Sequence, residues 1–184
     1  MKKVIASVVI VLAGLSIMYG GIKPYKKASL YVNAVKANPS SVQEFIAQFK
    51  KAFDYPSPVG QDELIRFIAN DISTVVGNNK NDEAVAQALV DFIHHYADPK
   101  IQEGVGMNYT QIVMMMGTIH TNKWKAYGKQ EDYDKAVQYF LLGYNINHDR
   151  PQFLIGLLEL YQASGEKEKA DAIQKHIAEL WNIK

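Results

Sequence analysis

The chain has 184 residues, of which 20 are basic and 19 acidic, for a formal net charge of +1, and 48% are hydrophobic. This length and composition suit one membrane segment and one folded domain, and the balanced charge argues against the clustered basic surface of a nucleic-acid-binding protein. The absence of cysteine excludes a disulfide framework, a thiolate zinc site, a thiol nucleophile and a lipid attached through cysteine.

An uncharged run of 19 residues, Val4–Ile22, follows Lys2 and Lys3. As a helix this run would cross the hydrocarbon core of a bilayer, which is about 30 Å thick. We predict an uncleaved membrane anchor over residues 1–27. A cleaved signal peptide is the alternative, since the basic start suits one. The run is long for a signal core, however, and no clean small-x-small cleavage site follows it.

The lysines on either side of the run bear on its orientation. Lys2 and Lys3 precede the run, and Lys23, Lys26 and Lys27 follow it, so the positive-inside rule nearly cancels. A very short basic tail most often stays in the cytoplasm. We therefore expect a single-pass membrane protein whose soluble part is extracytoplasmic.

Glycines and prolines predict breaks between the helices. Gly20, Gly21 and Pro24 predict a kink or an end of the membrane helix. Pro99 is expected to end or interrupt a later helix, with residues 99–107 forming a loop. No window of the chain alternates as a strand does, so the fold class is all-α.

Capping residues predict where two of the helices begin. Ser40 or Ser41 can accept hydrogen bonds from the free N–H groups of the helix that follows, and Glu44 suits a capping box with Ser41. Asn81 or Asp82 is expected to cap a later helix in the same way.

The most regular pattern lies in the C-terminal part of the chain. Tyr127 and Tyr161 are 34 residues apart, as are Ala136 and Ala170, and Gly165 stands between two predicted helices. Helix–turn–helix units of this period resemble tetratricopeptide repeats, which bury their apolar faces by stacking on one another. The resemblance places the tyrosines in first helices, the alanines in second helices and the glycine in a turn.

The predicted fold is therefore an N-terminal transmembrane helix followed by a tetratricopeptide-like right-handed α-solenoid of antiparallel helix pairs. Residues 1–27 form the anchor, residues 28–107 form degenerate repeat-like hairpins, and residues 108–184 form a pair of tetratricopeptide repeats.

The layout as a whole resembles the C-terminal span and repeat tail of O-antigen ligase or polymerase-like membrane proteins. The resemblance rests on KPYKKA at residues 23–28, FKKAFDYPSPVGQDELIRF at residues 49–67 and NINHDRPQF at residues 145–153. In that family a multi-span catalytic body precedes the tail. No such body is present in these residues, so the resemblance does not imply glycan transfer by this chain.

The residues able to carry chemistry form no recognised motif. The five histidines, His94 and His95 among them, lack metal-ligand spacing, and we interpret them as surface or rim side chains. Acid pairs such as Asp132 and Asp134 lie beside lysines, and we interpret them as solvated charges. The run Met114–Met116 is interpreted as core, with one methionine lining a groove as the alternative. We predict no enzyme activity, no metal site and no cofactor.

A repeat array of this kind predicts protein–protein interaction through its concave face. The candidates are polar residues on the first helices of the two units: Gln111, Thr118, Asn122, Gln152, Glu159 and Gln162. Ordinary solvent-facing side chains are the alternative. The expected partners are a membrane and an unidentified protein held in the repeat groove, and not nucleic acid. The expected role is assembly, with cell-envelope or surface-polysaccharide biosynthesis as a setting; a detached, non-catalytic ligase-like tail is the second hypothesis.

Overall fold

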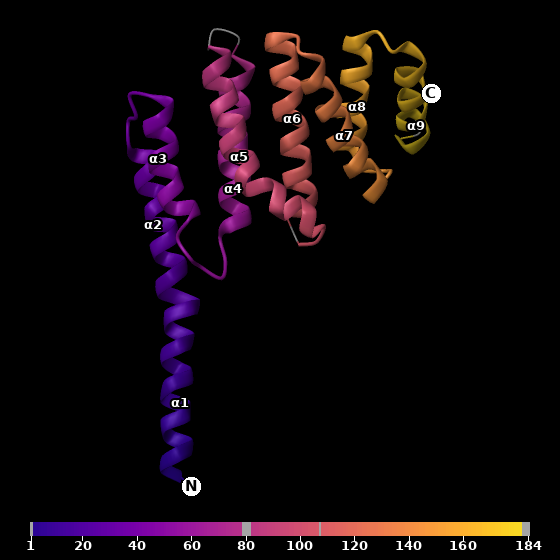
Figure 1. Cartoon of the computed structure of the whole chain (residues 1–184). Helices are drawn as coiled ribbons and strands as arrows, with labels where there is room; N and C mark the ends of the chain where they lie inside the picture. Colours follow the sequence, from indigo (N-terminus) through magenta and orange to yellow (C-terminus); the bar gives the residue numbers. More distant parts are fainter. Residues whose placement is uncertain (1, 79–81, 107, 182–184) are drawn as a thin grey trace. The chain divides into compact units, whose positions relative to one another are not determined.

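The computed structural model describes residues 2–78, 82–106 and 108–181. The regular secondary structure of these residues is entirely helical, which confirms the all-α part of the prediction (Figure 1). In chain order the helices are α1 (Lys2–Ile17), the π-helix η1 (Met18–Ile22), α2 (Lys23–Lys36), α3 (Val42–Phe53), α4 (Gln61–Gly77), α5 (Glu83–Glu103), α6 (Tyr109–Tyr127), α7 (Gln130–Ile146), α8 (Pro151–Ser164) and α9 (Lys167–Trp181). Contacts divide the chain into two units, Met1–Leu64 and Ile65–Lys184.

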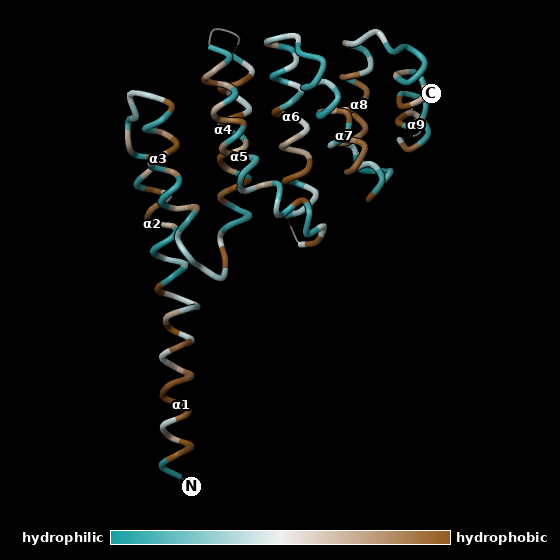
Figure 2. The backbone as a smooth tube through the Cα atoms, viewed as in Figure 1, coloured by the Kyte–Doolittle hydropathy of each residue, from teal (hydrophilic) through white to brown (hydrophobic). Residues whose placement is uncertain are grey.

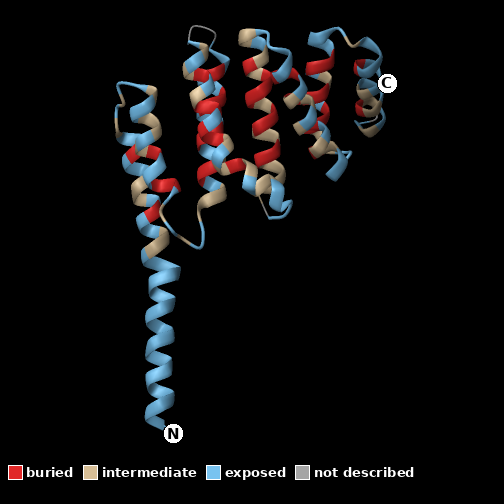
Figure 3. Cartoon of the chain, in the orientation of Figure 1, coloured by how far each residue is buried: buried red, intermediate tan, exposed pale blue. Residues whose placement is uncertain are grey.

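The first unit begins with an uninterrupted helix of 35 residues, Lys2–Lys36, made of α1, η1 and α2. Its α1 part is hydrophobic and none of its residues is buried (Figures 2 and 3). Length and composition make this helix able to cross a membrane, and a signal sequence near an N-terminus meets the same criteria.

Of the two predicted outcomes at Gly20, Gly21 and Pro24, a kink or an end of the span, the end is wrong, because the helix continues through all three residues. The chain widens into one π-helical turn, in which the Lys23 N–H donates to the Met18 carbonyl five residues earlier. A π-helical turn absorbs an extra residue without ending the helix, and Pro24 falls in the first turn of α2.

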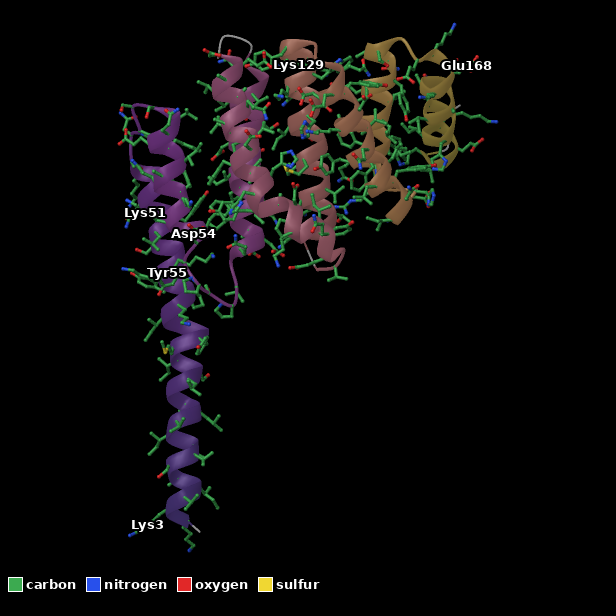
Figure 4. All side chains as sticks on the ribbon, in the orientation of Figure 1. Lys3, Lys51, Asp54, Tyr55, Lys129 and Glu168 are labelled. Carbon is green, nitrogen blue, oxygen red and sulfur yellow. The ribbon has the colours of Figure 1, made fainter. Side chains whose placement is uncertain are left out.

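A hairpin of α2 and α3 completes the first unit, and Lys27 connects its helices. The Lys27 side chain is 3% exposed, and its ammonium donates to the carbonyls of Phe53 and Tyr55 and to Gln61 Oε1, at 3.4, 3.0 and 2.6 Å. Figure 4 labels Asp54 and Tyr55 just beyond the end of α3. A cation at the C-terminal end of α3 also complements the helix dipole.

The predicted helix caps are found where the structure describes them. Ser41 caps α3 and accepts from the Glu44 N–H, while Glu44 reaches back to the N–H and hydroxyl of Ser40. Asp82 caps α5 by accepting from the Ala84 N–H. The alternative cap Asn81 lies outside the described residues.

In the second unit, helical hairpins pack around a shared core. One hydrophobic cluster joins α6, α7, α8 and α9, and consists of Val113, Tyr133, Ala136, Phe140, Phe153, Leu157, Leu160, Tyr161 and Ala170. Buried residues lie along α6 and α8 in Figure 3. Both repeat alanines belong to this core, with Ala136 0% and Ala170 5% exposed.

Glycines let aromatic rings approach the helix backbones inside this core. A Cβ added at Gly117 on α6 would lie 3.1 Å from the Phe140 ring, and one at Gly156 on α8 would lie 2.5 Å from the same ring. At Gly143 on α7 the added atom would lie 2.0 Å from the Phe153 ring. Gly143 and Gly156 therefore lie at distances that only a residue without a side chain permits, and Gly117 leaves little room for one.

The helix ends do not follow the 34-residue tyrosine spacing. Gly128 and Gly165 end α6 and α8 in the left-handed conformation, with φ of 73° and 81°. Tyr127 directly precedes its glycine, whereas Tyr161 lies four residues before its own. In α6 the residue four positions before the terminal glycine is Trp124, so Trp124 rather than Tyr127 corresponds to Tyr161 of α8.

The predicted loop over residues 99–107 is wrong for residues 99–103, which are helical, whereas residues 104–106 lie outside helix as predicted. Helix α5 continues through Pro99 to Glu103 and ends at Gly104, which has a φ of 69°. A proline inside a helix removes one backbone hydrogen bond. Apolar contacts offset this loss, since Ala97 is fully buried and Ile101 packs against the core cluster.

Candidate functional site

The six residues predicted to line a binding face divide between two helices and two kinds of environment. Gln111, Thr118 and Asn122 lie on α6, and all three are partly buried. Gln152, Glu159 and Gln162 lie on α8, and all three are exposed. The six therefore do not share one solvent-facing surface.

Of the three α6 residues, only Asn122 connects one helix to another. Asn122 donates to the Ser73 carbonyl and hydroxyl at 3.1 and 2.9 Å and so connects α6 to α4. Thr118 donates to the Met114 carbonyl within its own helix. The Gln111 side-chain oxygen is buried and accepts no hydrogen bond from the residues that the structure describes.

The α8 residues lie on one exposed face. Gln152, Ile155, Glu159 and Gln162 recur at helical spacing, and Ile155 is 51% exposed. We call these four residues the α8 face. Glu159 pairs with Lys125 of α6 through an exposed ion pair, so the α8 face adjoins the C-terminal end of α6.

A second group of polar residues was not predicted, and it is the most enclosed polar cluster in the described part of the second unit. Five side chains form a continuous series of contacts: Asp98, His94, His120, Asp132 and Lys123, which we call the polar chain. Its contacts run from Asp98 to His94 at 2.8 Å, from His94 to His120 at 2.9 Å, from His120 to Asp132 at 2.9 Å and from Asp132 to Lys123 at 2.8 Å.

Three neighbouring helices position the polar chain. His94 and Asp98 are four residues apart on α5, which places them on one face of that helix. His120 and Lys123 are three residues apart on α6, and Asp132 lies in the first turn of α7. The short connection between α6 and α7 brings Asp132 of α7 into contact with His120 and Lys123 of α6.

Burial increases from Asp98 to His120 and remains high at Asp132 and Lys123. The Asp98 side chain is 45% exposed and His94 is 18% exposed, whereas His120 and Asp132 are 1% and 3% exposed. A buried ion pair such as Lys123–Asp132 requires both partners, and removal of either leaves an unpaired charge at a cost of about 3–5 kcal/mol.

Burial also controls the charge of the inner imidazole. It lowers the pKa of His120 from 6.5 to about 4, with the hydrogen bond to Asp132 opposing that shift. The Tyr139 ring stacks on His120, with centroids 5.8 Å apart and planes inclined by 17°. Burial raises the pKa of the Tyr139 phenol, so this neighbour remains neutral.

The outer end of the polar chain opens into a surface pocket of 210 Å³ between α5 and α7. Its lining comprises Asp98, Ile101, Gln102, Gln138, Tyr139 and Leu142. A proton can therefore be exchanged with solvent at the Asp98–His94 end, whereas the Asp132–Lys123 end is closed.

Two interpretations made from the sequence are wrong here. The interpretation of the histidines as surface or rim side chains is wrong for His120, which is 1% exposed and contacts the partly exposed His94, whereas His95 is exposed. Asp132 is not a solvated charge, since it is 2% exposed and bonded to two bases. The four-residue spacing of His94 and Asp98 was the one signal in the sequence; the approach of three helices was not visible there.

The chemistry available to the polar chain is proton binding. Among the described residues, no group of three or more His, Asp or Glu side chains is arranged to hold a metal ion. Both imidazoles present Nδ1 to a carboxylate and Nε2 to each other, an arrangement that fixes ring orientation.

No family model, curated protein or solved structure matches the chain.

Proposed function

We propose that the chain is a single-pass membrane protein whose helical hairpins form a tetratricopeptide-like solenoid that mediates protein–protein interaction or assembly. The supporting observation is the unburied apolar helix that continues directly into a folded helical hairpin. A helix of this kind needs a lipid environment to cover its apolar side chains. The soluble helices would lie on the extracytoplasmic side, at the cell envelope, where surface polysaccharide is assembled.

The α8 face is the surface through which a protein partner would bind. Its exposed side chains combine two amide groups, a carboxylate and an isoleucine, whereas the α6 candidates are partly buried and Asn122 is bonded to α4. Polar groups around a central apolar side chain are typical of a protein interface.

Site-specific photo-crosslinking in intact membranes tests this proposal. A photoreactive residue at Gln152 or Gln162 is expected to capture a protein, whereas one at the exposed Lys175 of α9 serves as the matched control. Capture from the α8 face of a multi-span glycosyl-transferring enzyme would favour the ligase-like tail as the role of this chain. Equal yields at Gln152 and Lys175 would contradict the interaction face.

The membrane part of the proposal has its own test. The full chain is expected to remain with membranes after an alkaline wash. To test the orientation, protease is added to cells whose outer barrier has been opened but whose cytoplasmic membrane is intact, and it is expected to reach the soluble helices. Recovery of a shortened, soluble chain would identify the apolar helix as a cleaved signal sequence and overturn the anchor.

A further inference from the structure

The contacts of the polar chain need one more hydrogen than two neutral imidazoles can supply. Three contacts lie in series between Asp98 and Asp132, and each requires one hydrogen. An ionised carboxylate only accepts hydrogen bonds, and a neutral imidazole supplies one N–H. Two neutral rings therefore satisfy two contacts and leave the third with two lone pairs facing each other.

The contact left over is the one between the helices. Each Nδ1 faces a carboxylate, which only accepts hydrogen bonds and therefore favours the tautomer with the proton on Nδ1; in that tautomer both Nε2 atoms are unprotonated and 2.9 Å apart. One additional proton converts this repulsion into a hydrogen bond. The pair then carries one positive charge, which together with Lys123 balances the charges of Asp98 and Asp132.

We infer that a proton shared between His94 and His120 closes the contact between α5 and α6, and that its loss at higher pH releases α5, so that the second unit carries a pH-sensitive switch. This inference goes beyond the proposed interaction function and does not depend on it.

The surroundings place the additional proton on His94. His120 is enclosed, with Asp132 and Lys135 of α7 and the Tyr139 ring against it and Lys123 of α6 beside its acid partner. His94 lies nearer solvent and contacts Asp98 of its own helix. His94 therefore donates through Nε2, and His120 accepts.

The substitution Asp98→Asn separates this mechanism from a general effect of pH. An asparagine amide can donate to His94 Nδ1, so that His94 Nε2–H donates to His120 while both rings are neutral. The three contacts are then complete without the additional proton. Asp91→Asn is the matched control, because Asp91 is an exposed acid of α5 that contacts Gln87 and not the histidines.

The separation of α5 from α7 can be followed with two nitroxide labels on the full chain in detergent micelles. The chain has no cysteine, so Gln102→Cys and Gln138→Cys create the only labelling sites, and both residues line the pocket beside Asp98. In wild type and Asp91→Asn, the dipolar broadening of the nitroxide spectrum is expected to disappear as the pH rises and to reappear when the pH is lowered again. Asp98→Asn is expected to keep the broadening throughout.

Imidazole ¹⁵N spectra of the histidine-labelled chain identify the titrating group. The broadening is expected to disappear at the pH at which His94 loses its second N–H, while His120 stays neutral and protonated at Nδ1. Loss of broadening in Asp98→Asn at the wild-type pH, or retention in wild type after His94 is deprotonated, would overturn the inference. If circular dichroism shows that Asp98→Asn is unfolded, His94→Gln, which donates an amide N–H to His120 at every pH, takes its place with the same expected result.

Discussion

At the scale of single residues, glycines decide how closely the helices of the second unit approach. Gly143, Gly156 and Gly117 face aromatic rings at distances that leave graded amounts of room for a Cβ atom, from 2.0 to 2.5 to 3.1 Å. Helix propensity alone would predict that these three glycines destabilise their helices. Their packing partners explain why they occur inside α6, α7 and α8.

Alanine substitution at these glycines is expected to destabilise the second unit in the order of the clashes. Gly143→Ala should cost about 1–3 kcal/mol or more, Gly156→Ala less and Gly117→Ala least, because overpacking strains the neighbouring ring and backbone. Gly77→Ala is the control, since its nearest neighbour atoms, in Asn122, lie 3.4 Å from the added atom. Urea unfolding followed by circular dichroism measures the series, and an equal loss at Gly77 and Gly143 would contradict the packing argument.

The buried imidazole of His120 is expected to make the fold sensitive to acid. The folded state holds the pKa of His120 at about 4, against 6.5 in the unfolded chain. Between these values only the unfolded state takes up the proton, so the contribution of His120 to stability is full above pH 6.5 and is lost as the pH drops toward 4. The loss is on the order of 3 kcal/mol.

Unfolding free energies at pH 7 and pH 4.5 measure this effect. His120→Gln should reduce the loss of unfolding free energy between pH 7 and pH 4.5. His148→Gln, at an exposed position, should leave that loss as in wild type. An unchanged profile in His120→Gln would show that other groups control the acid response.

At the scale of elements, the α2–α3 hairpin depends on a cation placed at the C-terminal end of α3. Lys27→Met keeps most of the side-chain volume but leaves three acceptors without their donor. Unpaired buried acceptors cost about 1–3 kcal/mol each, so α3 is expected to separate more readily from α2. Limited proteolysis of the α3–α4 connection measures this change; the exposed Lys26→Met should be cleaved at the wild-type rate.

The cap residues are an example of local sequence patterns that predict the folded structure correctly. Ser41 and Asp82 could be chosen as caps because an N-cap needs only a short polar side chain next to a helix start. Pro99 shows the opposite case. Its ring is a local signal for a break, but packing of Ala97 and Ile101 kept the helix intact, and that packing involves residues distant in sequence.

At the scale of the whole molecule, the proposed membrane anchor rests on the apolar N-terminal helix. Leu12→Asp, near the middle of the apolar run, is expected to weaken membrane retention by about 3 kcal/mol, because a carboxylate is poorly tolerated at mid-bilayer. Val4→Asp, at the edge of the run, should have a smaller effect, since its charge can reach the interface. The fraction of chain retained after an alkaline wash measures both, and equal retention of the two variants would contradict a spanning orientation.

The sequence by itself determined the helical class, the apolar N-terminal helix and the caps, because helix periodicity, hydropathy and capping depend on residues within a few positions of one another. Only the tertiary structure decided which polar residues face solvent and which meet inside. His94, His120 and Asp132 come from three helices, and their contacts arise from how those helices pack rather than from any spacing along the chain. For the same reason Asn122, chosen as a binding residue, joins α6 to α4, while Gln152 and Gln162 remain available at the surface.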